Sequence, residues 1–236
     1  MEHDCPPFLA TYRGMEQGAP KLLDLLEAHD VRGTFFCTGD VARRYPQTMR
    51  RLVGAGHELG CHGDTHKRFG AMDEAEARRE LETSSAVLRD IAEVTSFRAP
   101  NLDMPERLLP LLSEYDYALD SSVGAHKPHM GHPGRPVTVR GMLRLPASTM
   151  PSVVRLPRAL RRLALGLLRD PVVLFFHPWE FVDVTREKLP LDCRFATGQP
   201  ALDSLADAIG FFRDRGATFV TMREIGADYR QNGMRN

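Results

Sequence analysis

One pattern runs along almost the whole chain and constrains its fold more than any other feature. A segment with the hydrophobic spacing of a helix is followed by a turn and then by a short apolar run. PKLLDLLEAHD (20–30), for example, precedes TFFCTG (34–39). The units that follow this pattern span residues 20–39, 46–62, 72–100, 104–122, 155–178 and 201–222. Alternation of this kind is typical of an α/β fold in which helices cover a parallel sheet.

No linker or low-complexity tract interrupts these units, so we expect one domain over residues 1–236. The units are numerous enough for either a closed barrel or an open, doubly wound sheet. No GxGxxG or P-loop sequence follows an expected strand, which excludes the commonest nucleotide-binding forms of the fold. Residues 123–150 have no helical pattern, and we expect an excursion there with one short strand, MLRLPAS (142–148).

Composition excludes several classes of partner. The formal net charge is +0 at pH 7, so no overall field attracts the chain to nucleic acid. No apolar run reaches membrane-spanning length, and the start MEHDCPPF does not resemble a signal peptide. The basic stretch 153–169 is interpreted as a solvated helix with a leucine face rather than as a membrane-surface helix. The four cysteines form no CxxC and indicate reduced thiols in a cytoplasmic protein, although an even count is also compatible with disulfides.

Polar residues with catalytic potential stand where the expected strands end. They are His62 with His66, Arg98, Asp120 and His177, together with Glu2 and Asp4 at the start of the chain. Catalytic residues of α/β barrels come from the carboxyl ends of the strands, so these side chains would meet on one rim.

Each of these residues, considered alone, also has an ordinary structural explanation. The histidines could be loop or buried hydrogen-bonded residues, Arg98 an ion-pair partner, and Asp120 a turn or helix-cap residue. The zinc protease motif HExxH is excluded because residue 63 is Gly. The convergence of the whole set on one rim is what indicates a catalytic site.

Short motifs occur in the order EHDCPPF, HGDTH, FRAPN, LDSS and FFHPWE and span residues 2–180. In this order they resemble the motifs of the NodB-homology polysaccharide deacetylases, carbohydrate esterase family four. The HPWE sequence and the acidic start are similar to a branch whose first motif is DxE rather than TFDDG. The resemblance implies a distorted (β/α)7-type barrel. It also implies a metal-dependent hydrolase that removes N-acetyl groups from an amino sugar or polysaccharide.

The resemblance also implies a role for each site residue. His62 and His66 would bind one divalent metal ion together with a carboxylate, either Glu2 or Asp4. Zinc is the expected ion, although other first-row divalent ions suit such a ligand set. A carboxylate of the first strand, for which Asp4 is the candidate, would act as general base and pair with Arg98. His177 would act as general acid towards the leaving amine, and Asp120 would orient His177.

Two features depart from the family's pattern. Gly63 stands where the family has Ser or Thr, whose hydroxyl braces the loop, and Asp64 or Thr65 is expected to replace that brace. At the start of the chain, Glu2 aligns with the second acid of DxE, and the position of the first acid lies before Met1. We therefore expect that the first strand is truncated in this sequence and that the true start lies upstream.

Two alternative functions stay open at this point. The same fold and metal could act on a small cyclic amide or ureide, because relatives with HPWE include such enzymes. The protein could also be a carbohydrate-binding or scaffold relative that has lost turnover. A bound metal separates both enzymes from a scaffold without a metal site, and acetate release separates a sugar substrate from a ureide.

Overall fold

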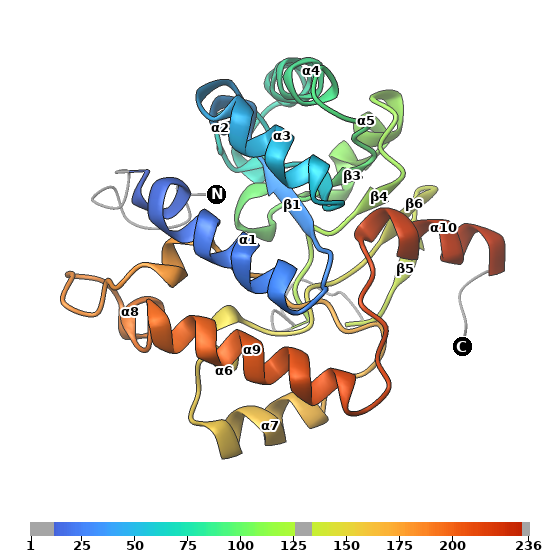
Figure 1. Cartoon of the computed structure of the whole chain (residues 1–236). Coiled ribbons are helices and arrows are strands. Elements are labelled where there is room, and N and C mark those ends of the chain that lie inside the picture. Colours follow the sequence, from blue (N-terminus) through green and yellow to red (C-terminus); the bar gives the residue numbers. More distant parts are fainter. Residues whose placement is uncertain (1–11, 126–133, 233–236) are drawn as a thin grey trace. The chain divides into compact units, whose positions relative to one another are not determined.

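The computed structural model describes residues 12–125 and 134–232 of the chain (Figure 1). These residues form two compact units. The sheet unit consists of residues 32–125, 134–147 and 220–232, and the helical unit consists of residues 12–31 and 148–219. The single domain expected over residues 1–236 stays a prediction.

A mostly parallel sheet forms the centre of the sheet unit. Its strands are β1 (Thr34–Cys37), β2 (Glu58–Cys61), β3 (Ser96–Phe97), β4 (Leu119–Asp120), β5 (Val137–Val139) and β6 (Met142–Arg144). They lie in the order β1-β2-β3-β4-β6-β5, with parallel neighbours except for the antiparallel pair β5–β6. The α/β class predicted from the alternating pattern is confirmed.

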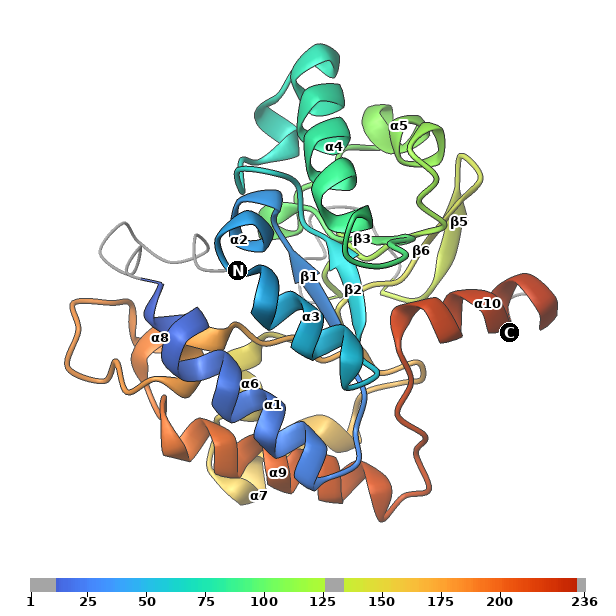
Figure 2. The same ribbon diagram turned by 45° about the horizontal axis from the view of Figure 1, so that its top comes forward.

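The helices of the sheet unit bury one apolar side each. They are α2 (Gly39–Arg44), α3 (Pro46–Gly54), α4 (Glu74–Arg89), α5 (Leu109–Glu114) and α10 (Met222–Asn232), with short 3-10 turns η3 (Phe69–Ala71), η4 (Pro100–Leu102) and η5 (Glu106–Leu108). The N-cap of α4 is Asp73, whose side chain accepts the N–H of Glu76. From there α4 buries Ala77, Leu81 and Leu88 and lies against α2 and β2 (Figure 2).

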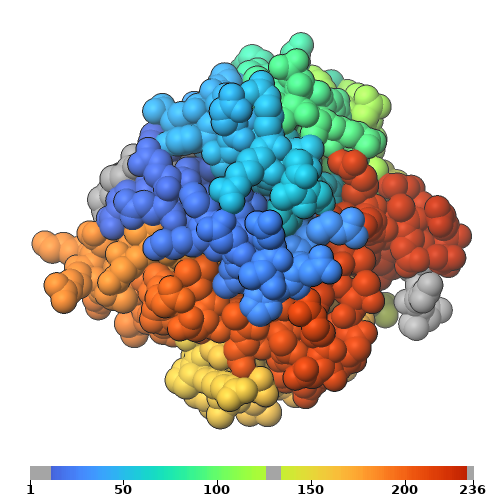
Figure 3. Space-filling model, in the orientation of Figure 1, coloured from blue at the N-terminus to red at the C-terminus, as the bar shows by residue number. Residues whose placement is uncertain are grey.

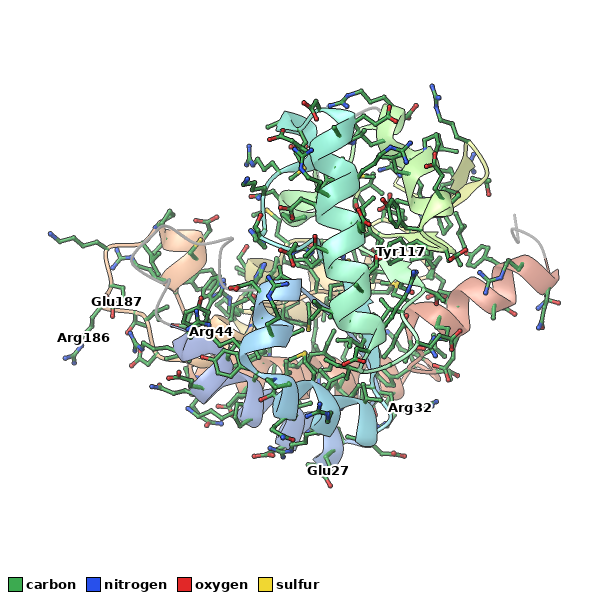
Figure 4. The ribbon with its side chains drawn as sticks, turned by 90° about the horizontal axis from the view of Figure 1, so that it is seen from above. Glu27, Arg32, Arg44, Tyr117, Arg186 and Glu187 are labelled. Atoms are coloured by element: carbon green, nitrogen blue, oxygen red, sulfur yellow. The ribbon has the colours of Figure 1, made fainter. Side chains whose placement is uncertain are left out.

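The core beneath α4 combines aromatic packing with a buried polar contact. Phe97 of β3 packs edge-on against Phe69, with ring centroids 5.3 Å apart. The hydroxyl of Tyr117 shares a hydrogen bond of 2.6 Å with Ser85 of α4, and Figure 4 shows Tyr117 beside this helix. Burial raises the pKa of Tyr117 well above its usual value, so the phenol remains a neutral contact between α4 and the segment before β4.

Helices and turns build the described part of the helical unit. They are the π-helix η2 (Gly14–Gly18), α1 (Ala19–Ala28), α6 (Pro151–Val154), α7 (Arg158–Gly166), the 3-10 helix η7 (Pro178–Phe181), α8 (Leu191–Arg194) and α9 (Gln199–Arg213). Val154, Leu165, Ala208 and Phe211 form one buried cluster between α6, α7 and α9. The outer face of α7, yellow in Figure 3, exposes leucines. None of the helices in the described residues is long and apolar enough to cross a membrane.

Two segments that we expected to be strands, 171–178 and 217–222, contain no strand. In the first segment, the carbonyl of Val173 accepts the N–H of Ser148, and the N–H of Val173 donates to the hydroxyl of Ser148. Because the second bond ends on a side chain rather than on a backbone carbonyl, the two segments form no β-ladder. In the second, Thr221 donates its N–H to Glu224 at 2.7 Å and starts α10 instead. Among the described residues the sheet ends at β1 and β5, and closure into a barrel stays a prediction.

Candidate functional site

Three residues share the carboxyl edge of the sheet because strands β1 to β4 end in register. Each donates its N–H to the last carbonyl of the neighbouring strand. These residues are His62, Arg98 and Ser121, with N–H···O distances of 2.9, 2.9 and 2.8 Å. The structure therefore brings two of the predicted site residues together, and places beside them Ser121, a strand-end residue for which we predicted no role.

His62 and His66 lie next to each other at the start of the loop after β2. Their ring centroids are 5.0 Å apart, and both side chains are buried. Nδ1 of His62 bonds to the backbone carbonyl of Arg98. A metal-binding histidine commonly donates its other ring N–H to such a carbonyl, which fixes the tautomer and turns Nε2 towards the ion. The two histidines therefore fit two ligand positions of a divalent metal ion.

The carboxylate of the predicted ligand set lies outside the described residues, because Glu2 and Asp4 both precede residue 12. Within residues 12–125 and 134–232, no group of three or more His, Cys, Asp and Glu side chains is arranged to hold a metal ion. The roles of Glu2 and Asp4 as metal ligand and general base therefore stay predictions.

Arg98 is oriented by contacts along the sheet edge. Its Nε donates to the backbone carbonyl of Ser121 at 3.1 Å, and a terminal nitrogen donates to the hydroxyl of Ser121 at 2.7 Å. The guanidinium carbon lies 4.5 Å from the centre of the Phe36 ring, within the range of a cation–π contact. These contacts hold a permanent positive charge at the edge. Its pairing with the base carboxylate stays a prediction, because that carboxylate lies outside the described residues.

Asp120 is fully buried one residue before the edge. Its Oδ2 accepts a hydrogen bond from Nε of Arg144 at 2.7 Å, and its Oδ1 accepts the backbone N–H and the hydroxyl of Ser122. Burial raises the pKa of Asp120, and the positive charge of Arg144 opposes that shift. In the sheet unit Asp120 is thus the partner of a buried arginine. Its orienting role towards His177 stays a prediction.

His177 precedes η7 in the helical unit. Its backbone N–H and its Nδ1 lie 2.8 and 3.1 Å from Oε1 of Glu180. Its ring stacks on Trp179 with an interplanar angle of 18°. Glu180 is fully buried, and its other oxygen lies 3.3 Å from Nε of Arg155.

Glu180 therefore holds the His177 ring, a role for which we had considered only Asp120. The sequence did carry a signal for it. In HPWE, Pro178 at the first helical position and Glu180 three residues after His177 form the pattern of a capped helix start.

The sequence profile of the family described as Polysaccharide deacetylase matches residues 4–119. Over these residues, the chain belongs to the polysaccharide deacetylase family. The family predicted from the order of the motifs is thereby confirmed, and its DxE/HPWE branch stays a prediction.

Two curated relatives illustrate the extent of the similarity. A peptidoglycan-N-acetylglucosamine deacetylase from Bacillus cereus is 33% identical over 73 residues, which are 31% of this chain and 26% of the relative. A chitooligosaccharide deacetylase from Sinorhizobium fredii is 36% identical over 84 residues, which are 34% of this chain and 39% of the relative. The chain spans less than half the length of each of these relatives.

Solved structures share the polysaccharide deacetylase fold over most of the chain. A peptidoglycan N-acetylglucosamine deacetylase has a TM-score of 0.62 at 21% identity, covering 88% of this chain and 81% of its own. A pseudoenzyme of carbohydrate esterase family four from Bacillus anthracis has a TM-score of 0.61 at 15% identity, and the aligned part covers 89% of this chain and 60% of the pseudoenzyme chain. At these identities the likeness concerns the fold alone.

Proposed function

We propose that this protein is a metal-dependent hydrolase that removes N-acetyl groups from an amino sugar within a polysaccharide or oligosaccharide. The observation that carries the proposal is the pair of buried imidazoles, His62 and His66, at the carboxyl edge of the sheet, with Nδ1 of His62 bonded to a backbone carbonyl. The family of the chain supports the reaction class. Relatives named as deacetylases of peptidoglycan and of chitooligosaccharides support the substrate class.

In the proposed site, His62 and His66 supply neutral ring nitrogens, and Glu2 or Asp4 supplies the carboxylate. A divalent ion such as zinc, when bound, supplies a Lewis acid that polarises an acetamide carbonyl and lowers the pKa of water. The bond from His62 to the Arg98 carbonyl keeps the ring in one tautomer, which a metal ligand requires.

The remaining site residues transfer protons or stabilise the general base. A carboxylate near the start of the chain, with Asp4 as our candidate, takes a proton from the attacking water, and Arg98 stabilises that carboxylate. His177 gives a proton to the amide nitrogen as the C–N bond breaks, so the products are acetate and the free amine. Because Glu180 holds Nδ1 of His177, the Nε2 atom is the one that carries this proton to the substrate.

Acetate release tests the proposal. The protein, supplied with zinc, cobalt or manganese, should release acetate from N-acetylglucosamine oligomers or peptidoglycan fragments. His177→Ala should lose this activity while it still binds zinc. A protein that binds zinc and releases no acetate from either substrate would contradict the deacetylase function and favour a scaffold that has lost turnover.

A further inference from the structure

The loop between His62 and His66 is hydrogen-bonded to a carboxylate of helix α4. Glu80 of α4 accepts the backbone N–H groups of Asp64 and Thr65 on Oε2, at 2.8 and 2.9 Å. Its Oε1 accepts the hydroxyl of Thr65 at 2.5 Å. Glu80 is only 9% exposed, and its bond to Asp64 is buried, whereas the two bonds to Thr65 are part-buried. Both oxygens of one carboxylate thus hold the stretch that separates His62 from His66.

The backbone of this loop needs such an anchor. Gly63 has φ +75° and His66 has φ +62°, so the chain enters the left-handed region on both sides of Asp64 and Thr65. Glycine adopts this region readily, whereas a histidine persists there only when its surroundings determine the conformation. Successive N–H groups in such a turn point to the same side and attract an anion. The Glu80 carboxylate occupies that position.

A second restraint holds the same loop from α2. Arg43 donates two hydrogen bonds to the carboxylate of Asp64, at 2.8 and 3.1 Å. Gly39 and Asp40 donate their N–H groups to the carbonyls of Gly63 and Asp64 at 3.0 and 3.1 Å. Arg43 is partly exposed, with 43% of its side chain accessible, so this fork is the weaker of the two anchors.

We infer that Glu80 is a positioning residue that sets the spacing of His62 and His66 and thereby the affinity of the site for its metal ion. The inference rests on the proposed metal site. It also suggests how the chain compensates for Gly63: Thr65, one of the two residues expected to replace the brace, donates its hydroxyl to the Glu80 carboxylate of α4. Asp64 contributes through Arg43.

The comparison of Glu80→Ala with Glu80→Gln tests the inference. Glutamine keeps an oxygen for the two N–H groups and an amide that can donate to the Thr65 hydroxyl, so it preserves the geometry without the charge. We expect the zinc dissociation constant, measured by competition with a chelator, to rise about tenfold or more in Glu80→Ala. In Glu80→Gln it should stay within about threefold of wild type. Glu82→Ala, which removes an exposed acid from the same helix, should leave it unchanged.

Several outcomes would overturn the inference. Glu80→Ala with wild-type zinc affinity would show that the bonds do not position the histidines, and equal losses in Glu80→Ala and Glu80→Gln would assign the effect to charge. If Glu80→Ala does not fold, as judged by circular dichroism, Thr65→Val is the variant to test, because it removes only the bond from the Thr65 hydroxyl. We expect Thr65→Val to weaken zinc binding severalfold. An unchanged zinc affinity in Thr65→Val would also overturn the inference. Wild-type protein that binds no zinc would end the proposed function and this inference together. Wild-type protein that binds zinc but releases no acetate would end only the proposed function.

Discussion

The Nδ1 atom of His177 lies 3.1 Å from Oε1 of Glu180, and the same oxygen accepts the backbone N–H of His177. A buried carboxylate in this position stabilises the protonated imidazole and fixes which nitrogen faces away from it. If His177 is the general acid, the rate should fall at high pH as the imidazole loses its proton.

The first prediction concerns this loss of activity at high pH, which is the upper limb of the pH profile. Glu180→Gln should move the upper limb of the pH profile of kcat/KM to lower pH, because the carboxylate beside the His177 ring is replaced by a neutral amide. Asp120→Asn measured alongside separates the two candidate partners. A shift in Asp120→Asn alone would give the orienting role to Asp120, and an unmoved limb in Glu180→Gln would refute the role of Glu180. The melting temperature of each variant shows whether it is folded under the assay conditions.

The second prediction concerns the buried pair of Asp120 and Arg144. Asp120→Asn should lower the free energy of unfolding by about 3 kcal/mol or more, because a buried guanidinium loses its counter-charge. The double variant Asp120→Asn/Arg144→Met should lose less than the sum of the two single variants in urea unfolding. Glu114→Gln, which breaks an exposed pair with Arg78, should change stability little. Strict additivity of the two buried substitutions would mean that the pair is not coupled.

The third prediction concerns the imidazole ligands. His62→Ala should abolish stoichiometric zinc, as measured by elemental analysis after dialysis, because two remaining donors hold the ion too weakly. His57→Ala is the matched control. His57 precedes the same strand at its opposite end, where its Nδ1 accepts the N–H of Gly33 at 3.1 Å. Full retention of zinc in His62→Ala would disprove the ligand assignment.

The fourth prediction concerns the close contact between η2 and η7 in the helical unit. A Cβ atom on Gly18 would lie 1.8 Å from the carbonyl oxygen of Pro178, the residue after His177. Gly18→Ala should therefore displace this turn, lower stability by about 2 kcal/mol and reduce kcat. Gly210→Ala in α9 should not destabilise, because a Cβ there meets nothing within 4 Å and alanine favours the helix. Wild-type stability and kcat in Gly18→Ala would show that the contact relaxes without cost.

The fifth prediction concerns stability at alkaline pH. Burial raises the pKa of Cys37 from 9.0 to about 12, so the thiol ionises in the unfolded chain at a lower pH than in the folded one. Its contribution to stability is therefore complete below pH 9 and is lost as the pH rises towards 12. At pH 10 the loss should be about 1 kcal/mol. Cys37→Ala should remove that part of the pH dependence, whereas Val41→Ala, a buried truncation without a titrating group, should keep it. Parallel pH profiles for Cys37→Ala and wild type would rule out the effect.

The sequence alone determined the α/β class and the location of the strands in the sheet unit except β5, which it did not predict. Hydrophobic periodicity is a local property, because it reflects which side of a helix or strand is buried. It placed β1, β2, β3, β4 and β6 within the expected segments. Since parallel strands in register align their carboxyl ends, it also placed His62 and Arg98 at one edge.

The tertiary structure decided which side chains pair. Glu80 lies 14 residues beyond His66 and shares the buried side of α4 with Ala77 and Ser84, but this helical spacing does not reveal that its carboxylate reaches the loop between the two histidines. Asp120 forms an ion pair with Arg144 because β4 and β6 are adjacent in the sheet and in register, although β5 lies between these two strands in the sequence. The segments 171–178 and 217–222 have the composition of strands but no ladder, because strand formation requires a second backbone at hydrogen-bonding distance. Pairing depends on register and reach across the fold, and those are properties of the packed chain rather than of any local stretch of sequence.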